Sequence, residues 1–214
     1  MTIELVIFDC DGVLVDSEII ACEELKKALG DCGLDMTLDE VIKTFVGLSM
    51  TSGVKIIQEM LGHDLPDDFL TRLQTKTFAA FQDSLMPVQD IQDVLEKLTT
   101  MPQKICVASS GALEKIAFTL GLTGLKGYFQ GNIFSTSQVP RGKPYPDIYL
   151  YAARQMDADP SRCLVVEDSL PGVQGAVAAG MEVLAYATRG QDKRLANAGG
   201  MVISQMKDVI KYLA

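Results

Sequence analysis

The sequence is short of positive charge. Its 214 residues include 19 Lys and Arg against 28 Asp and Glu, which gives a net charge of −9. Proteins that bind nucleic acid through its backbone neutralise phosphates with Lys and Arg, so this composition argues against a nucleic-acid partner. An anionic small molecule would still need local positive charge or a metal ion where it binds.

The sequence also lacks a disulfide pattern and has little histidine. The five cysteines are odd in number and form no C-x-x-C pair, which argues against a disulfide framework and favours a reducing compartment. The only histidine, His63, lies in an expected surface turn.

Long hydrophobic runs are absent. The first apolar run, residues 3–8, is far too short to span a membrane and is followed by acids. We therefore expect no membrane partner and a cytoplasmic location. Hydrophobic residues make up 48% of the chain and charged residues 22%, as in soluble globular proteins.

Four short apolar segments predict strands, at residues 3–8, 104–108, 163–166 and 182–186. Strands that are covered on both faces are almost continuously apolar, as these are. Apolar residues at helical spacing follow in 91–98 and 206–213. This alternation predicts an α/β fold, with a Rossmann-like parallel sheet and helices on both faces.

The stretch between the first two strands is too long for a single crossover helix. Apolar residues at helical spacing indicate several helices there, around 21–32, 54–61 and 69–81. We therefore expect two domains. Residues 1–16 and 87–214 would form the α/β core, and residues 17–86 an inserted α-helical cap.

Chemically active side chains follow the predicted strands. Ligands of open parallel sheets bind at the carboxyl ends of the strands. The residues at these positions are Asp9 and Asp11, then Ser109 and Ser110, then Glu167 and Asp168, with Lys143 in a loop before the last pair. On a continuing strand Asp9 and Asp11 would point the same way, and two close carboxylates favour a cation between them. With Asp168 added and no His or Cys, this ligand set suits Mg²⁺.

The motif of residues 9–17, DCDGVLVDS, resembles the first motif of the haloacid dehalogenase-like phosphatase superfamily, in its branch of phosphatases and beta-phosphoglucomutases. Ser109 resembles the second motif, Lys143 in GKPYPD the third, and Glu167 with Asp168 the fourth. The predicted insertion resembles the α-helical cap of that family. A lone D-x-D is weak evidence, whereas four motifs in order are strong.

The resemblance implies a role for each acidic residue. Asp9 would be the nucleophile that forms an aspartyl-phosphate, and would also bind Mg²⁺. Asp11 would protonate the leaving oxygen and then activate water, while its backbone carbonyl faces the metal. Asp168 would ligate Mg²⁺, and Glu167 would lie near the metal or behind its ligands.

The resemblance also implies how the phosphate is held. Ser109, with Ser110 and a nearby backbone N–H, would bind the phosphoryl oxygens. Lys143 would neutralise their charge and hold the nucleophile in place. The substrate would be a small phosphorylated metabolite, a sugar or sugar-acid phosphate, and the protein a monomer or weak homo-oligomer.

Two absences favour hydrolysis over the phosphomutase alternative. The mutase-like pattern has a His in the first cap helix and an Arg in the cap loop. Residues 16–22 contain no His, and residues 46–50 contain no cation. A non-catalytic regulator with the same fold is a further alternative, against which Asp9, Asp11, Lys143 and Asp168 weigh.

Several of these residues, taken singly, have plainer interpretations. Asp9 and Asp11 precede a glycine and could be turn residues. Ser109 could cap a helix that starts near Gly111, and Ser169 is expected to cap one. Lys143 taken alone would be a surface lysine.

Overall fold

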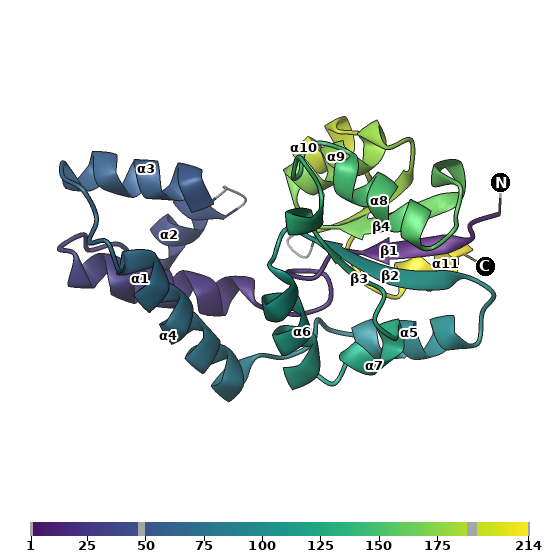
Figure 1. The fold of residues 1–214 in the computed structure, drawn as a ribbon, viewed down its shortest axis with the longest axis horizontal. Coiled ribbons are helices and arrows are strands. Elements are labelled where there is room, and N and C mark those ends of the chain that lie inside the picture. The colour runs from purple at the N-terminus through teal and green to yellow at the C-terminus, as the bar shows by residue number, and fades with distance from the viewer. Residues whose placement is uncertain (1, 47–49, 188–191, 214) are drawn as a thin grey trace. The chain divides into compact units, whose positions relative to one another are not determined.

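The computed structural model describes residues 2–46, 50–187 and 192–213 (Figure 1). The chain forms two compact units, Met1–Asp16 with Met86–Ala214, and Ser17–Leu85. The chain returns to the first of these units at Met86, one residue before the position expected from the sequence. The first of these units is called the core unit below, and the second the helical unit.

The core unit is built on a six-stranded parallel sheet in the order β3-β2-β1-β4-β5-β6. Its strands are β1 Leu5–Phe8, β2 Lys104–Ser109, β3 Ile133–Ser135, β4 Cys163–Glu167, β5 Glu182–Tyr186 and β6 Met201–Ile203. In the central strand, Phe8 is in register with Val107 on one side and Val166 on the other. The predicted α/β class with a parallel sheet is confirmed.

Helices cover both faces of this sheet (Figure 1). They are α5 Ile91–Thr99, α6 Leu113–Leu122, α7 Lys126–Phe129, α8 Asp147–Gln155, α9 Leu170–Ala178, α10 Lys193–Asn197 and α11 Asp208–Leu213, with short 3₁₀ turns at Thr136–Gln138 and Pro160–Arg162. Leu5 and Ile7 of β1 belong to one core cluster with side chains of α8, α9 and α10. On the opposite face, the ring of Phe129 lies edge-on to that of Phe8, 6.3 Å between centroids. Both faces of β1 are thus buried, which explains its uninterrupted apolar sequence.

The helical unit contains α1 Glu18–Asp31, α2 Leu38–Phe45, α3 Met50–Leu61 and α4 Phe69–Ser84. Its own core gathers buried side chains of all four helices, among them Leu29, Val41, Ile57 and Phe69. The start of α2 is fixed by reciprocal hydrogen bonds between Thr37 and Glu40. This helix was not predicted, although T-x-x-E before an apolar run is a start signal.

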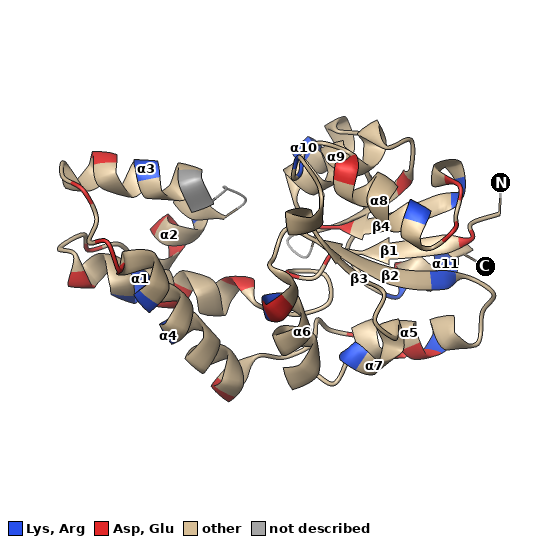
Figure 2. Ribbon diagram, in the orientation of Figure 1, with Lys and Arg blue, Asp and Glu red and all other residues tan. Residues whose placement is uncertain are grey.

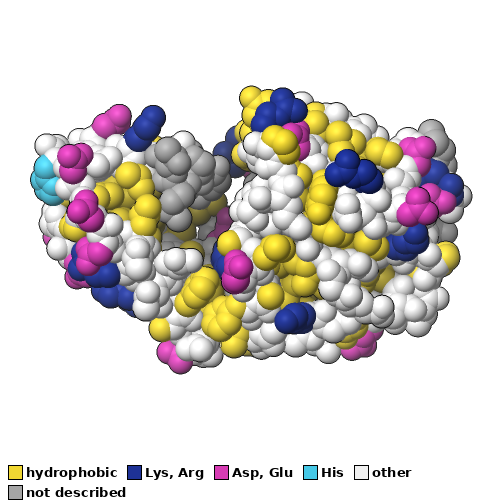
Figure 3. Space-filling view, in the orientation of Figure 1, with side chains coloured by type: hydrophobic (Ala, Val, Ile, Leu, Met, Phe, Trp, Pro, Cys, Tyr) yellow, Lys and Arg dark blue, Asp and Glu magenta, His cyan; other side chains and the backbone are white. Residues whose placement is uncertain are grey.

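Acidic and basic residues are interspersed along the ribbon of both units (Figure 2). On the face shown in Figure 3, Lys and Arg lie singly or beside acids and form no continuous basic surface. None of the helices in the described part of the chain is long and apolar enough to cross a membrane.

Candidate active site

Asp9 lies at the carboxyl end of β1, between the ends of β2 and β4. Its backbone N–H donates to the carbonyl of Val166 at 3.0 Å, so the sheet pairing holds this residue in place. The residue is 7% exposed. Burial raises the pKa of Asp9 to about 7; Lys143 opposes this rise and Glu167 adds to it.

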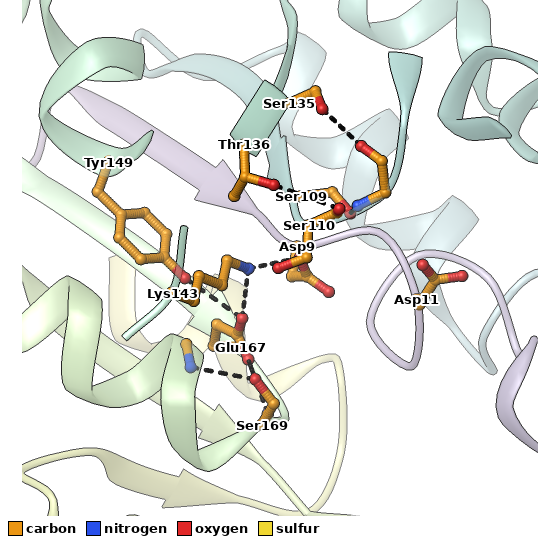
Figure 4. A network of polar contacts seen from close by, with 12 residues as sticks. Asp9, Asp11, Ser109, Ser110, Ser135, Thr136, Lys143, Tyr149, Glu167 and Ser169 are labelled. Atoms are coloured by element: carbon orange, nitrogen blue, oxygen red, sulfur yellow. Dashed lines mark hydrogen bonds and ion pairs between the residues drawn. The ribbon is translucent and has the colours of Figure 1, made fainter. Parts of the chain in front are cut away.

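Lys143 joins two of the expected site residues. Its Nζ donates to Oδ1 of Asp9 at 2.7 Å and to Oε1 of Glu167 at 2.5 Å (Figure 4). The side chain is 5% exposed and comes from the loop before α8. Burial lowers the pKa of Lys143, but the two carboxylates outweigh it and hold this pKa well above its usual value. The interpretation as a surface lysine is therefore wrong.

Glu167 anchors this lysine. Its Oε1 also accepts from the Tyr149 hydroxyl at 3.2 Å, and its Oε2 accepts from the N–H and hydroxyl of Ser169 at 2.7 and 2.9 Å. Ser169 in turn caps α9 by accepting from the N–H of Gly172, as predicted. Both oxygens of Glu167 are thus engaged in holding neighbouring groups.

Ser109 is the last residue of β2, and Ser110 begins the loop that follows. Ser109 is buried, and its hydroxyl oxygen accepts from the N–H of Gly111 at 3.2 Å. From the end of β3, Ser135 donates to the carbonyl of Gly111 at 2.6 Å, and Thr136 donates to that of Ser110 at 3.3 Å (Figure 4). Hydrogen bonds therefore fix the carbonyl groups of Ser110 and Gly111.

α6 begins at Leu113, later than the start near Gly111 that a capping role for Ser109 assumed. Its N-cap is Ala112, without a side-chain cap. Ser109 therefore does not cap α6. Its hydroxyl hydrogen is left to donate elsewhere, because the hydroxyl oxygen is the acceptor in the bond from Gly111.

Asp168 lies against the loop that carries Asp9 and Asp11. A Cβ added to Gly12 would overlap Oδ2 of Asp168 and lie 2.8 Å from its Cγ. Gly12 also has φ of +77°, a conformation that favours glycine. The carboxylate thus occupies space that only a glycine leaves open, and it reaches the loop from another strand end.

These residues suit a magnesium ion. Among the described residues, no group of three or more His, Cys, Asp or Glu side chains is placed to hold a metal. Mg²⁺ needs fewer, because it usually keeps several waters and takes one or two carboxylates. Asp9 and Asp168 supply two carboxylates, and a backbone carbonyl such as that of Asp11 is a suitable third oxygen.

Asp11 bonds a lysine that the sequence did not single out. The Nζ of Lys115 donates to Oδ2 of Asp11 at 2.7 Å. The expectation that Asp9 and Asp11 share one direction assumed a continuing strand, but β1 ends at Phe8 and the chain turns at Gly12. Asp9 and Asp11 instead bond different lysines.

The structure adds further residues to the site, namely Lys115, Ser135, Thr136, Gly111 and Tyr149. One sequence signal exists for Lys115, because a cation in the first turn of a helix opposes the helix dipole and calls for an acidic partner. Ser135 and Thr136 lie at the end of β3 and Tyr149 lies in α8, two elements that the sequence did not predict. The expected residues Asp9, Lys143 and Glu167 do come together, with Ser109 and Ser110 on the adjacent strand exit and Asp168 against Gly12.

The family model of the haloacid dehalogenase-like hydrolases matches residues 3–180. A 6-phosphogluconate phosphatase of Escherichia coli is 31% identical over 86% of this chain and 82% of that protein. A phosphorylated carbohydrates phosphatase of Thermotoga maritima is 28% identical over 98% of both chains.

Solved structures share the fold over nearly the whole chain. A hydrolase of the same family from Deinococcus radiodurans, with bound phosphate and sodium, has a TM-score of 0.84 at 28% identity and covers 99% of this chain and 95% of its own. A Thermotoga maritima chain provisionally described as a beta-phosphoglucomutase has a TM-score of 0.84 at 27% identity, covering 99% of this chain and all of its own, 100%.

Proposed function

The chain belongs to the haloacid dehalogenase-like hydrolase family and is a phosphatase, and we propose that it hydrolyses small sugar or sugar-acid phosphates through an aspartyl-phosphate on Asp9. The observation that carries this proposal is the bond from Lys143 to Asp9 and Glu167 at the carboxyl edge of the sheet. A buried lysine there offers positive charge to a phosphoryl group beside a carboxylate that can attack it.

In the first step, Asp9 attacks phosphorus while Lys143 and the hydroxyl of Ser109 hold the phosphoryl oxygens. Asp11 gives its proton to the leaving alcohol oxygen. In the second step, Asp11 takes a proton from a water molecule whose oxygen attacks phosphorus. The bond between phosphorus and Asp9 breaks, which releases phosphate and restores the Asp9 carboxylate. Glu167 helps to fix the position of Lys143, because its carboxylate accepts from the same ammonium as Asp9 does.

A magnesium ion would be held by the carboxylates of Asp9 and Asp168 and by the backbone carbonyl of Asp11. Bound there, it would supply positive charge against the acids of the site and the anionic phosphate. Support comes from the hard oxygen donors and from the space left by Gly12.

The substrate class is supported by the names of the relatives, one for 6-phosphogluconate and one for phosphorylated carbohydrates. We propose that this chain acts on the same class. All five cysteines are free thiols, which supports the proposed cytoplasmic location.

The phosphomutase alternative is kept because one similar structure is provisionally described as a beta-phosphoglucomutase. The missing cap His falls in residues 16–22, whereas residues 47–49 of the cap loop lie outside the described part of the chain. The role of residues 17–85 as a cap, and of residues 45–50 in substrate choice, is part of the proposal.

The test is a panel of phosphate esters with and without Mg²⁺, scored for both free phosphate and rearranged sugar phosphate. The panel contains 6-phosphogluconate, fructose 1-phosphate, both anomers of glucose 1-phosphate, and a nucleoside monophosphate. We expect free phosphate from sugar or sugar-acid phosphates, and its loss when the metal is chelated. Rearranged glucose phosphate without free phosphate would favour the mutase, and no release from any ester would favour the regulator.

A further inference from the structure

Lys115 stands at an unusual place in its helix. It lies in the first turn of α6, Leu113–Leu122, where the positive end of the helix dipole disfavours a cation. Its partner Asp11 is separated from it by 104 positions in the sequence, and the Nζ–Oδ2 distance is 2.7 Å. We propose that Lys115 is a positioning residue, which holds Asp11 for proton transfer to the leaving group. This inference rests on the proposed function.

Lys115 also runs beside the loop expected to bind phosphate. A Cβ built on Gly111 would lie 3.5 Å from Cδ of Lys115 and 3.6 Å from Oγ of Ser109. The aliphatic part of the lysine therefore packs close to this loop, while its ammonium reaches Asp11. One side chain thus links the loop with the expected acid.

The ion pair of Lys115 with Asp11 is partly exposed to solvent, unlike the pair of Lys143 with Asp9. The side chains of Lys115 and Asp11 are 29% and 28% exposed, whereas those of Lys143 and Asp9 are 5% and 9% exposed. A partly exposed acid beside the phosphate loop is open to the leaving oxygen of a bound ester.

The two lysines bind different acids of the site. Lys143 serves the nucleophile Asp9, and Lys115 serves Asp11. When the P–O bond of the ester breaks and the bond to Asp9 forms, the proton of Asp11 passes to the leaving oxygen. Asp11 is then a carboxylate, which the Lys115 ammonium holds by its hydrogen bond. A water molecule next attacks phosphorus and gives a proton to Asp11, while the bond to Asp9 breaks. Ester and water thereby become alcohol and phosphate.

The experiment compares an ester that needs a proton donor with one that does not. Fructose 1-phosphate releases an alkoxide, whereas p-nitrophenyl phosphate releases a stable anion. The measured quantity is kcat/KM, which covers the steps up to loss of the leaving group. For Lys115→Met we expect a fall of roughly 10- to 100-fold with fructose 1-phosphate, and less than about threefold with p-nitrophenyl phosphate. Lys115→Arg should recover much of the loss.

Further variants separate a role through Asp11 from other roles. In an Asp11→Asn background, Lys115→Met should cause no further loss, because the group on which it acts is gone. The exposed Lys126 of the same unit serves as control, and Lys126→Met should match the wild type on both esters. Melting temperatures of all variants report on folding.

Three results would overturn the inference. They are an equal loss on both esters, a rise in KM alone, and unchanged kinetics with fructose 1-phosphate. The proposed function is tested apart from these by Asp9→Asn. If that variant keeps its activity on both esters, the proposed function fails; if Asp9→Asn is inactive and Lys115→Met is unaffected, only the inference fails.

Discussion

The ammonium of Lys143 donates to the carboxylate of Asp9 across 2.7 Å, in a setting from which most solvent is excluded. Glu167 shares the same ammonium at 2.5 Å. Two buried carboxylates around one buried cation leave a net negative charge at the carboxyl edge of the sheet. Such an arrangement favours a second cation, which agrees with the proposed magnesium site.

Lys143→Met is expected to unfold more easily and to release no phosphate. The variant leaves Asp9 and Glu167 buried without their shared cation, which costs about 3–5 kcal/mol in the free energy of unfolding. Urea denaturation at pH 8 measures this loss. Lys97→Met, on the exposed side of α5, is the control and should change little. Equal stability of the Lys143 variant and the control would contradict the structural role of this bond.

Gly12→Ala is expected to weaken Mg²⁺ binding roughly 10- to 100-fold, because the added Cβ displaces Asp168. Gly124→Ala is a matched control. Gly124 has φ of +73°, but nothing lies within 4 Å of its added Cβ. Both variants thus share a backbone penalty of about 1–2 kcal/mol, and only the first displaces a carboxylate. Isothermal titration calorimetry measures the Mg²⁺ affinity of both variants. Equal affinities would contradict the proposed metal site.

Mg²⁺ affinity is expected to rise with pH through about 7. The pKa of Asp9 is raised to about 7 by burial, so below that pH the carboxyl is largely protonated in the metal-free protein. A metal must displace this proton, and binding should release protons below pH 7 and few above pH 8. Calorimetry in buffers of different ionisation enthalpy measures the release. An affinity that stays constant from about pH 5.5 to 8 would exclude Asp9 as a ligand with this pKa.

Ser135→Ala is expected to raise the inhibition constant of inorganic phosphate about tenfold, or roughly 1.4 kcal/mol. The hydroxyl of Ser135 donates to the carbonyl of Gly111 at 2.6 Å and so steadies the loop that follows Ser109. Ser161→Ala removes an exposed serine of the same unit and serves as control. Unchanged inhibition by phosphate would show that the loop does not depend on this bond.

The strands that the sequence predicted are the longer ones of the sheet. β1, β2, β4 and β5 are buried over most of their length, so each reads as an almost continuous apolar run. β3 and β6 have three residues each and lie at the two edges of the sheet. Segments this short carry no periodic signal, and only their neighbours in the fold define them.

The start of α9 was expected from its N-cap Ser169, but no apolar spacing indicated the helix that follows. It contains Gly172 and Gly175, which lower helix propensity. A Cβ on Gly172 would overlap the carboxylate of Glu167, and one on Gly175 would lie 3.2 Å from Cε2 of Tyr149. These glycines make room for the site, so local sequence and tertiary packing disagree there.

The site was predictable where residues follow the ends of long strands. Asp9, Ser109, Glu167 and Asp168 take their positions directly from β1, β2 and β4. The pairing of Lys115 with Asp11 depends on where α6 begins relative to the turn at Gly12, which no local pattern encodes. The catalytic roles assigned to these residues stay predictions.

The most direct test of the proposed mechanism is to find the phosphoryl group on Asp9 during turnover. The protein is mixed with Mg²⁺ and a sugar phosphate that it hydrolyses, then quenched in acid and digested. Mass spectrometry measures the mass of the peptide that contains Asp9. We predict one added phosphoryl group on this peptide in the wild type and none in Asp9→Asn, which should also release no phosphate. Phosphate release at the wild-type rate by Asp9→Asn would contradict the account.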